Sequence, residues 1–135
     1  MMDFKDKVAV ITGAASGLGR AMADRCVQEA MKVVLADVEV EALAKTEASM
    51  KASGATVLAV RTDVSQARDL EALAQKTLEA FGAVHLLCNN AGVGTAAAIW
   101  ESTVADWEWV IGVNLWGVIH GVRVFVPIML EQDTE

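Results

Sequence analysis

A glycine-rich turn between a short apolar run and a helix-forming segment is the feature that most restricts how this chain can fold. The run Lys7–Thr12 has the length and composition of a buried strand, and Gly19–Ala30 has helical character. Between them, Gly13 can make a tight turn, while Gly17 and Gly19 allow close approach to the backbone. A helix that begins there directs free N–H groups and its positive dipole end at an anion. The sequence therefore predicts a strand–turn–helix unit with an anion-binding corner.

The spacing of the glycines distinguishes this turn from two other phosphate-binding loops. It follows the order GxxxGxG, whereas the two-domain dehydrogenases have GxGxxG. A P-loop is excluded because Gly19, Arg20 and Ala21 stand where Gly-Lys-Ser/Thr is required.

The rest of the chain continues to alternate between strand and helix patterns. Further strands are predicted over Met31–Ala36, Thr56–Arg61 and Val84–Cys88. Helices are predicted over Glu39–Ser53, from a Ser65 cap to Phe81 with Gly82 as the stop, and from a capping box at Thr103–Asp106. The inward stripe of that last, long helix is predicted as Trp107, Val110, Ile111, Asn114, Val118, Val122, Phe125 and Met129.

Four successive β-then-α units predict the α/β class. The expected architecture is a Rossmann-type, doubly wound parallel sheet with strand order 3-2-1-4 and helices on both faces, truncated after the fourth βα unit. Residues 1–135 are expected to form one domain. A ligand would bind in the crevice between strands 1 and 4, where the winding direction reverses.

An acidic residue at the end of the second strand narrows the choice of ligand. Asp37 lies 24 residues after Gly13. In dinucleotide-binding folds, a carboxylate about 20 residues after the glycine loop hydrogen-bonds the ribose. It would repel the 2′-phosphate of NADP, and neither Ser16 nor Val38 supplies a compensating cation, so NAD is expected over NADP. The alternative is that the glycines only form a turn and Asp37 caps the next helix.

Charge and composition exclude several other classes. A net charge of −7 and a pI near 4.8 argue against nucleic-acid and anionic-membrane partners. Cys26 and Cys88 have no metal-site spacing, so no metal is expected, and free thiols favour the cytoplasm. The apolar stretch Trp116–Leu130 is interrupted by His120 and Arg123 (and by Pro127), so we do not expect it to span a bilayer.

Five features in order give the chain a specific resemblance. They are the loop at residues 12–19, Asp37, the pair Asp63 and Val64, the Asn-Asn-Ala-Gly run at 89–92, and Asn114. The chain resembles the short-chain dehydrogenase/reductase family over essentially its whole length. That resemblance implies hydride transfer between NAD and an alcohol or carbonyl substrate, and a homo-oligomer.

The resemblance also implies roles for individual positions. Ser16, Leu18 and the loop backbone would hold the pyrophosphate and the adenosine ribose. Asp63 and Val64 would contact the adenine ring. The cofactor crevice beyond the fourth strand would be lined by Asn89, Ala91 and Gly92. Asn114 resembles the asparagine of the family's catalytic tetrad, which helps to hold a proton relay.

Asn114 is also unusual by position, because it interrupts an apolar helical stripe between Val110 and Val118. A buried amide there must find hydrogen bonds. The alternative interpretation is a core amide satisfied by the backbone.

The family's tyrosine base is missing, because the chain contains no tyrosine. The chain ends about where a fifth strand would begin, so it cannot supply the family's catalytic serine and Tyr-x-x-x-Lys motif. The two cysteines, His85 and His120 are expected to be structural. The alternatives to an oxidoreductase are a catalytically inactive NAD-binding module and a truncated product; an epimerase or dehydratase is disfavoured because its GxxGxxG loop is absent. With its fourth strand and long helix uncovered, the chain is expected to associate.

Overall fold

A four-stranded parallel sheet forms the centre of the molecule. The computed structural model describes residues 3–132. The strands are β1 (Val8–Thr12), β2 (Lys32–Asp37), β3 (Val57–Arg61) and β4 (Leu86–Cys88), in the order β3-β2-β1-β4. The predicted strand order is therefore confirmed. β4 is shorter than predicted, since Val84 and His85 precede its first paired residue.

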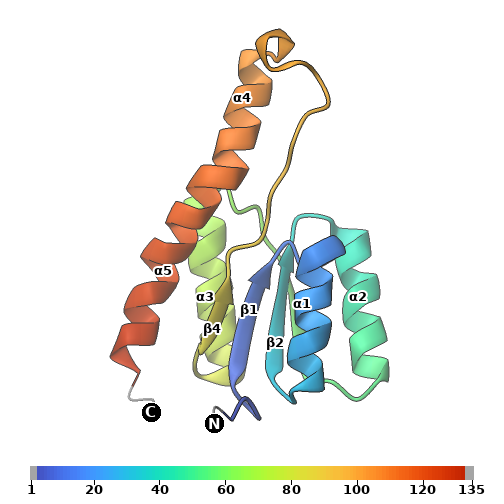
Figure 1. The fold of residues 1–135 in the computed structure, drawn as a ribbon. Coiled ribbons are helices and arrows are strands. Elements are labelled where there is room, and N and C mark those ends of the chain that lie inside the picture. The colour runs from blue at the N-terminus through green and yellow to red at the C-terminus, as the bar shows by residue number, and fades with distance from the viewer. Residues whose placement is uncertain (1–2, 133–135) are drawn as a thin grey trace.

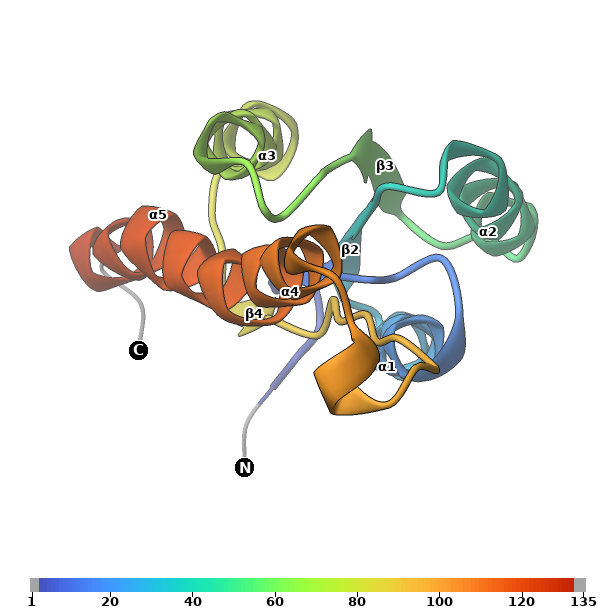
Figure 2. The same cartoon turned by 90° about the horizontal axis from the view of Figure 1, so that it is seen from above.

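Helices cover both faces of the sheet (Figures 1 and 2). α1 (Gly17–Gln28) and α2 (Val40–Ala52) lie on one face, and α3 (Ala67–Phe81) and α5 (Gly117–Glu131) lie on the other. Alternate strand residues feed two separate cores, because successive side chains of a strand point to opposite faces. Ile11 and Leu35 pack toward α1 and α2, whereas Val10 and Val34 pack with residues of α3 and α5.

The start of α3 differs from its prediction. Its N-cap is Gln66, not Ser65. The Ser65 hydroxyl instead donates to Asp63 Oδ1 at 2.6 Å, which ties it to the loop before the helix. The predicted stop is confirmed, since Gly82 has the left-handed φ of +75° that favours glycine.

The predicted long helix is one column with an irregular turn in its middle (Figure 1). After a short 3-10 turn, η1 (Ile99–Glu101), α4 spans Val104–Ile111, and the π-helical η2 (Gly112–Trp116) joins it to α5. The predicted capping box opens α4: Asp106 N donates to Thr103 Oγ1 at 3.1 Å, and Thr103 N donates to Asp106 Oδ2 at 3.0 Å.

The inward stripe predicted for this column is largely wrong. Only Phe125 of the predicted residues is fully buried, and the others that α5 buries are Gly117 and Gly121. A Cβ on Gly117 would lie 2.7 Å from Val64 Cγ2, and one on Gly121 would lie 2.1 Å from Asn89 Oδ1. At these two positions the helix approaches its neighbours so closely that a side chain could be added only if Val64 or Asn89 moved. The exposed members of the predicted stripe are Trp107, Ile111, Asn114, Val118 and Val122.

Length and composition alone would allow the column Val104–Glu131 to cross a membrane, with a mean hydropathy of 1.5 over its most apolar window. One side of the column is nevertheless packed against the rest of the protein. Gly117, Gly121 and Phe125 pack against the sheet side that also carries α3, in the layer that an α/β fold requires.

Candidate functional site

The candidate site lies at the carboxyl ends of β1 and β4. β2 pairs with one side of β1 and β4 with the other, so this is the point where the order of the strands reverses. The chain leaving β1 enters α1 on one face, whereas the chain leaving β4 runs toward α4 and the other face (Figure 2). Ligands of open α/β sheets bind in the crevice that such a divergence opens.

The glycine loop brings β1 and α1 into direct contact. Gly13 has a φ of +67°, and a Cβ on Gly19 would lie 2.0 Å from the Gly13 carbonyl oxygen. Gly17, with a φ of +57°, has nothing within 4 Å of its Cβ position, so the loop is open to solvent there. Ser16 makes no side-chain cap, and α1 has no acidic residue in its first turn. Its first N–H groups and its positive end are therefore free to bind an anion.

Two residues that the sequence analysis did not assign hold the loop against β4. Thr12 Oγ1 accepts hydrogen bonds from Asn90 N and Ala91 N, each at 3.0 Å, and donates to the Cys88 carbonyl. Asn90 Nδ2 donates to the Thr12 carbonyl at 3.0 Å. Both residues lie inside motifs that the sequence identified. Their structural role becomes visible only in the fold, where the end of β1 is hydrogen-bonded to the segment after β4.

Asp37 lies at the end of β2 and faces the same loop. Its Oδ2 accepts from Ala15 N at 3.0 Å, and its Oδ1 accepts from Glu39 N at 2.9 Å. The second bond is an Asx turn before α2, whose N-cap is Glu39, so Asp37 does not cap that helix. The side chain is half-buried, and each carboxylate oxygen has a further lone pair that could accept from a hydroxyl.

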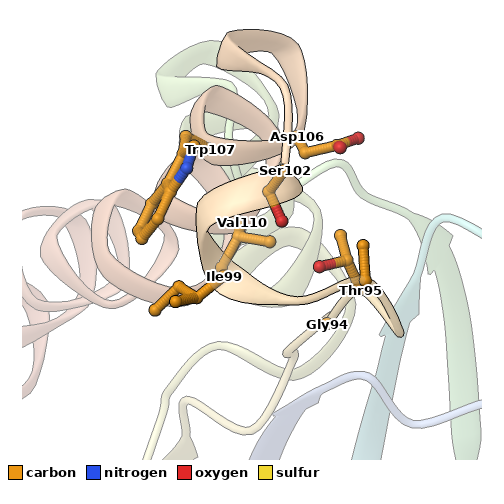
Figure 3. Close-up of a pocket in the computed structure, with 8 residues that line it drawn as sticks. Gly94, Thr95, Ile99, Ser102, Asp106, Trp107 and Val110 are labelled. Carbon is orange, nitrogen blue, oxygen red and sulfur yellow. The ribbon is translucent and has the colours of Figure 1, made fainter.

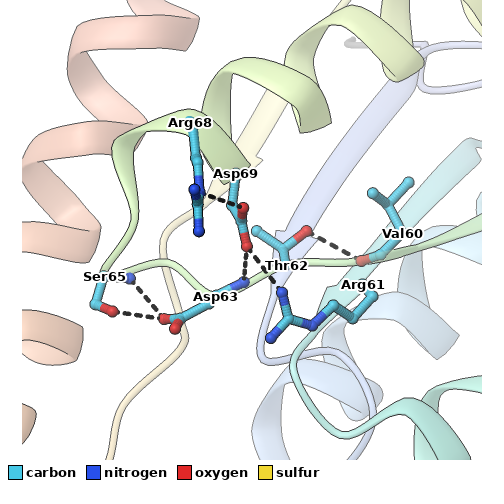
Figure 4. A network of polar contacts seen from close by, with 7 residues as sticks. All are labelled: Val60, Arg61, Thr62, Asp63, Ser65, Arg68 and Asp69. Carbon is cyan, nitrogen blue, oxygen red and sulfur yellow. Dashed lines mark hydrogen bonds and ion pairs between the residues drawn. The ribbon is translucent and has the colours of Figure 1, made fainter.

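Asp63 belongs to a polar network after β3 (Figure 4). Its Oδ1 accepts from Ser65 N and Oγ, and its own N–H donates to Asp69 Oδ2 at 2.9 Å. Asp69 also pairs with Arg61 at 3.2 Å. The next residue, Val64, is buried against Gly117, so its backbone and not its side chain is the part left to contact a ligand.

The Asn-Asn-Ala-Gly run continues from β4 into the crevice. Asn89 Oδ1 is buried beside Gly121 and has no hydrogen-bond partner within residues 3–132. Ala91 packs on the core shared with α5, and Gly92 is exposed. A Cβ on Gly92 would lie 3.5 Å from Asn114 Oδ1, so this run and η2 meet.

Asn114 is exposed, which contradicts the expectation of a buried amide. It lies in the π-helical turn, where it pairs with the backbone of Val93 in both directions. Asn114 Oδ1 accepts from Val93 N, and Asn114 Nδ2 donates to Val93 O, each at 2.8 Å. The amide is thus satisfied by backbone, as the alternative interpretation proposed, but at the surface. It anchors the loop after β4 to the long helix.

A cavity of about 290 Å³ opens beside this anchor, between the loop that begins at Gly94 and α4 (Figure 3). Its walls include Thr95, Ile99, Trp107 and Val110. The glycine loop does not line it, so it is separate from the predicted anion site. Sequence patterns did not reveal it, because Ile99 and Trp107 come from different elements and only the fold brings them together.

The cysteines and histidines show no arrangement for nucleophilic catalysis. Burial raises the pKa of Cys26, with a smaller contribution from Cys88, and burial also raises the pKa of Cys88, so both thiols remain protonated and poorly reactive. His85 Nδ1 accepts from Val8 N at 2.9 Å. His120 stacks on Trp116 with the ring centroids 5.6 Å apart. Residues 3–132 contain no cluster of His, Cys, Asp and Glu that could bind a metal.

Comparison with known proteins agrees with this geometry. The family model described as short chain dehydrogenase matches residues 7–134. A CLA biosynthesis dehydrogenase/reductase from Lactiplantibacillus plantarum is 39% identical over 134 residues, which are 99% of this chain and 47% of that protein. The chain thus spans about half the length of the curated relatives it matches.

Solved structures give the same result. A short chain dehydrogenase/reductase from Burkholderia phymatum in complex with NAD superposes with a TM-score of 0.97 at 58% identity, covering 99% of this chain and 48% of the other. The L-sorbose reductase from Gluconobacter frateurii, complexed with NADPH and L-sorbose, gives a TM-score of 0.87 at 33% identity, covering 95% and 50%. Sequence, fold and the geometry of the loop agree: the chain belongs to the short-chain dehydrogenase/reductase family.

Proposed function

We propose that this chain is the NAD-binding part of an oxidoreductase that transfers hydride between NAD and an alcohol or carbonyl substrate. The observation that carries the proposal is the joint between β1, α1 and β2. There the uncapped start of α1 is held against Gly13 through Gly19, and Asp37 bonds the loop at Ala15 N. A pyrophosphate at the helix start and a ribose at the carboxylate match these two chemistries. Residues 1–135 are proposed to act as one cofactor-binding domain.

The cofactor would contact groups along the crevice. Ser16, Gly17 and Leu18 would lie along the pyrophosphate, and Leu18 is 78% exposed and free to cover it. The loop at Asp63 and Val64 would contact the adenine through polar and backbone atoms. Asn89, Ala91 and Gly92 would border the cofactor beyond β4.

The preference for NAD rests on charge. Asp37 is a carboxylate at the ribose position, and a 2′-phosphate there would meet like-charge repulsion. The relatives include one solved with NAD and one solved with NADPH, so membership of the family does not decide between them. The neutral loop residues and Asp37 of this chain favour NAD.

When bound, the nicotinamide supplies or accepts the hydride. The chain's own residues would bind and orient the cofactor, and Asn114 fixes the loop at Val93, which would border the reaction site. Because the Asn114 amide is already paired, its contribution to a proton relay would come through its backbone. The general base would come from outside these residues, since the chain has no tyrosine.

The second candidate function is an NAD-binding module without turnover, and the same missing tyrosine favours it for this chain alone. The coding sequence after Glu135, checked against the intact mass of the native protein, separates the two. A serine followed by Tyr-x-x-x-Lys would support the oxidoreductase. A stop codon and a native mass of 14.3 kDa would leave the binding module.

Calorimetric titration with NAD and NADP tests the cofactor site. We expect NAD to bind more tightly than NADP, and Asp37→Ala to weaken NAD binding by about tenfold or more, because a hydrogen bond to a charged group is worth roughly 1.5–3 kcal/mol. Asp37→Asn removes the charge but keeps one acceptor, so it should reduce the difference in affinity between NAD and NADP.

A matched control is Asp24→Ala, which removes the same charge from an exposed site on α1. It should leave NAD binding unchanged. Equal affinities of the unmodified chain for NAD and NADP would contradict the preference, and absence of binding to either would contradict the function.

We also propose that the protein is a cytoplasmic homo-oligomer. The free thiols of Cys26 and Cys88 suit a reducing compartment, and the exposed apolar side of α4 and α5 suits a subunit contact. Light scattering should show a mass of at least two chains, and a monodisperse monomer would contradict it.

A further inference from the structure

The cavity beside Asn114 is positioned to take part in the proposed reaction. Asn114 holds Val93 through two hydrogen bonds of 2.8 Å, and Gly94, the next residue, lines the cavity. A group seated in the cavity would therefore lie directly beyond the segment that borders the reaction site.

The walls of the cavity select for an apolar occupant. Ile99, Trp107 and Val110 supply aliphatic and aromatic surface, and Trp107 is 43% exposed, so its ring is available for contact. Figure 3 shows Ser102 and Thr95 directing their hydroxyls toward the same space. The Ser102 hydroxyl already has a partner in the Ala98 carbonyl, at 3.5 Å.

Charge excludes an anionic occupant. Among residues 3–132, Asp106 is the only ionisable residue in the walls, and one of its oxygens is engaged by Thr103 N in the capping box. No lysine or arginine from this part of the chain lines the space. A carboxylate or phosphate placed here would meet a like charge without a compensating cation.

The volume sets the size of the occupant. An apolar cavity of about 150 Å³ holds a benzene molecule, and sites for drug-sized ligands begin at about 300 Å³. The 290 Å³ measured here therefore suits one ring with a short substituent.

We infer that this cavity binds the apolar, ring-sized end of a neutral alcohol or carbonyl substrate, with the reacting carbon directed toward Val93. The assignment rests on the proposed function, because it names the substrate class for the same reaction. Trp107 and Val110 are the contacts that distinguish a ring from a small aliphatic carbonyl compound.

The test uses the chain labelled with 5-fluorotryptophan, whose four tryptophans give separate fluorine resonances that Trp→Phe variants assign. Acetophenone is the probe, and acetone is the control because it has the carbonyl without the ring. Acetophenone should shift the Trp107 resonance saturably, and acetone should not. A Trp107 resonance that does not respond, or a shift that does not saturate, would overturn the inference.

Two tryptophans of α4 provide a matched pair of variants. Trp107 and Trp109 are 43% and 50% exposed, but only Trp107 lines the cavity. In calorimetric titrations, which do not depend on the Trp107 resonance, Trp107→Ala should weaken acetophenone binding by about tenfold, since it removes an aromatic wall, whereas Trp109→Ala should leave it unchanged. Equal losses in both would show non-specific adsorption and would overturn the inference.

Val110→Phe gives a second, independent variant, which fills the cavity and should abolish the saturable shift while circular dichroism stays unchanged. NAD titration of the unmodified chain separates the two proposals. Absent probe binding with intact NAD binding in that chain refutes the cavity alone. Intact probe binding without NAD binding refutes the cofactor function alone.

Discussion

The two faces of the sheet differ in how completely their helices bury their apolar residues. On the face of α1 and α2, the core closes around Ile11 and Leu35, and the helices turn their polar sides to solvent. On the other face, α5 also packs on the sheet, but the column of α4 and α5 exposes large apolar residues. These include Trp109, Trp116, Val122 and Leu130.

The sheet ends in two edge strands, β3 and β4. Within residues 3–132, β4 pairs with β1 alone and is the outer strand on the side of α5. The Gln132 carboxamide pairs with Val84 there: Oε1 accepts from Val84 N and Nε2 donates to Val84 O, each at 2.7 Å. This satisfies one residue before β4 but leaves the strand edge itself open. The face of α1 and α2 therefore buries its apolar residues within the chain, while the side of α4 and α5 leaves large apolar residues exposed, as proteins do at interaction sites.

The largest expected loss of stability is at the contact between Gly13 and Gly19, where β1 meets α1. Gly19→Ala places a Cβ 2.0 Å from the backbone carbonyl of Gly13, and a backbone atom cannot move aside without moving the strand. We expect a loss of about 3 kcal/mol in the free energy of unfolding, measured by urea denaturation, together with loss of NAD binding.

Gly94→Ala is the control for that variant, because nothing lies within 4 Å of its Cβ position. Its unfolding midpoint should match that of the unmodified chain. A Gly19→Ala variant as stable as this control would show that the joint is not closed.

The corresponding substitution in the other region should cost less. Gly121→Ala places a Cβ 2.1 Å from Asn89 Oδ1, which is a side-chain atom that can rotate away. The expected loss in unfolding free energy is about 1–2 kcal/mol. An equal or larger loss than for Gly19→Ala would reverse the comparison and make the α5 contact the stiffer one.

A smaller effect is expected at the surface anchor. Asn114→Ala removes both hydrogen bonds to Val93, and we expect a loss of about 1 kcal/mol because the pair is solvent-exposed. Hydrogen exchange at the Val93 amide should accelerate. Asn114→Asp keeps the acceptor for that amide but loses the donor, so in this variant the Val93 amide should exchange at a rate closer to that of the unmodified chain. Identical exchange rates in the unmodified chain and both variants would show that Asn114 does not hold Val93.

The smallest effect is a pH dependence at the amino end of β1. Burial, with help from Lys7, lowers the pKa of His85, whose Nδ1 accepts from Val8 N. The unfolded chain binds the proton more readily, so the stabilisation is present above the ordinary histidine pKa of about 6.5 and is lost as pH falls below it. His85→Gln keeps an acceptor without titrating, and its stability should vary less between pH 7 and pH 5. An equal pH dependence would refute the role of His85.

Much of the fold was predictable because its signals are local. The glycine turn, the capping box at Thr103 and the left-handed Gly82 depend on residues near each other in the chain, and the structure confirms all three. The cap at Ser65 was predicted wrongly for a related reason. Ser65 instead belongs to a turn that Asp63 closes by accepting from both Ser65 N and Ser65 Oγ, and the helix is capped one residue later, at Gln66.

The face of the long helix was not predictable in the same way. Periodicity assigns the inward face to large apolar residues, but here Gly117 and Gly121 face inward because α5 lies so close to Val64 and Asn89. Likewise, nothing local indicates that Thr12 and Asn90 bind each other, since Thr12 ends β1 and Asn90 follows β4, 78 residues later in the chain.

By itself, then, the sequence determined the order of strands and helices, the glycine turn after β1 and the acid that faces it. These follow from backbone preferences and from the right-handed crossover rule, which act over short stretches of chain. Only the tertiary structure decided which face of α5 is buried, that Asn114 anchors Val93 at the surface, and that Ile99 and Trp107 enclose a cavity. Those outcomes depend on the distances between packed helices and strands. These distances are set by close packing of all the elements together, so no single segment of the sequence determines them.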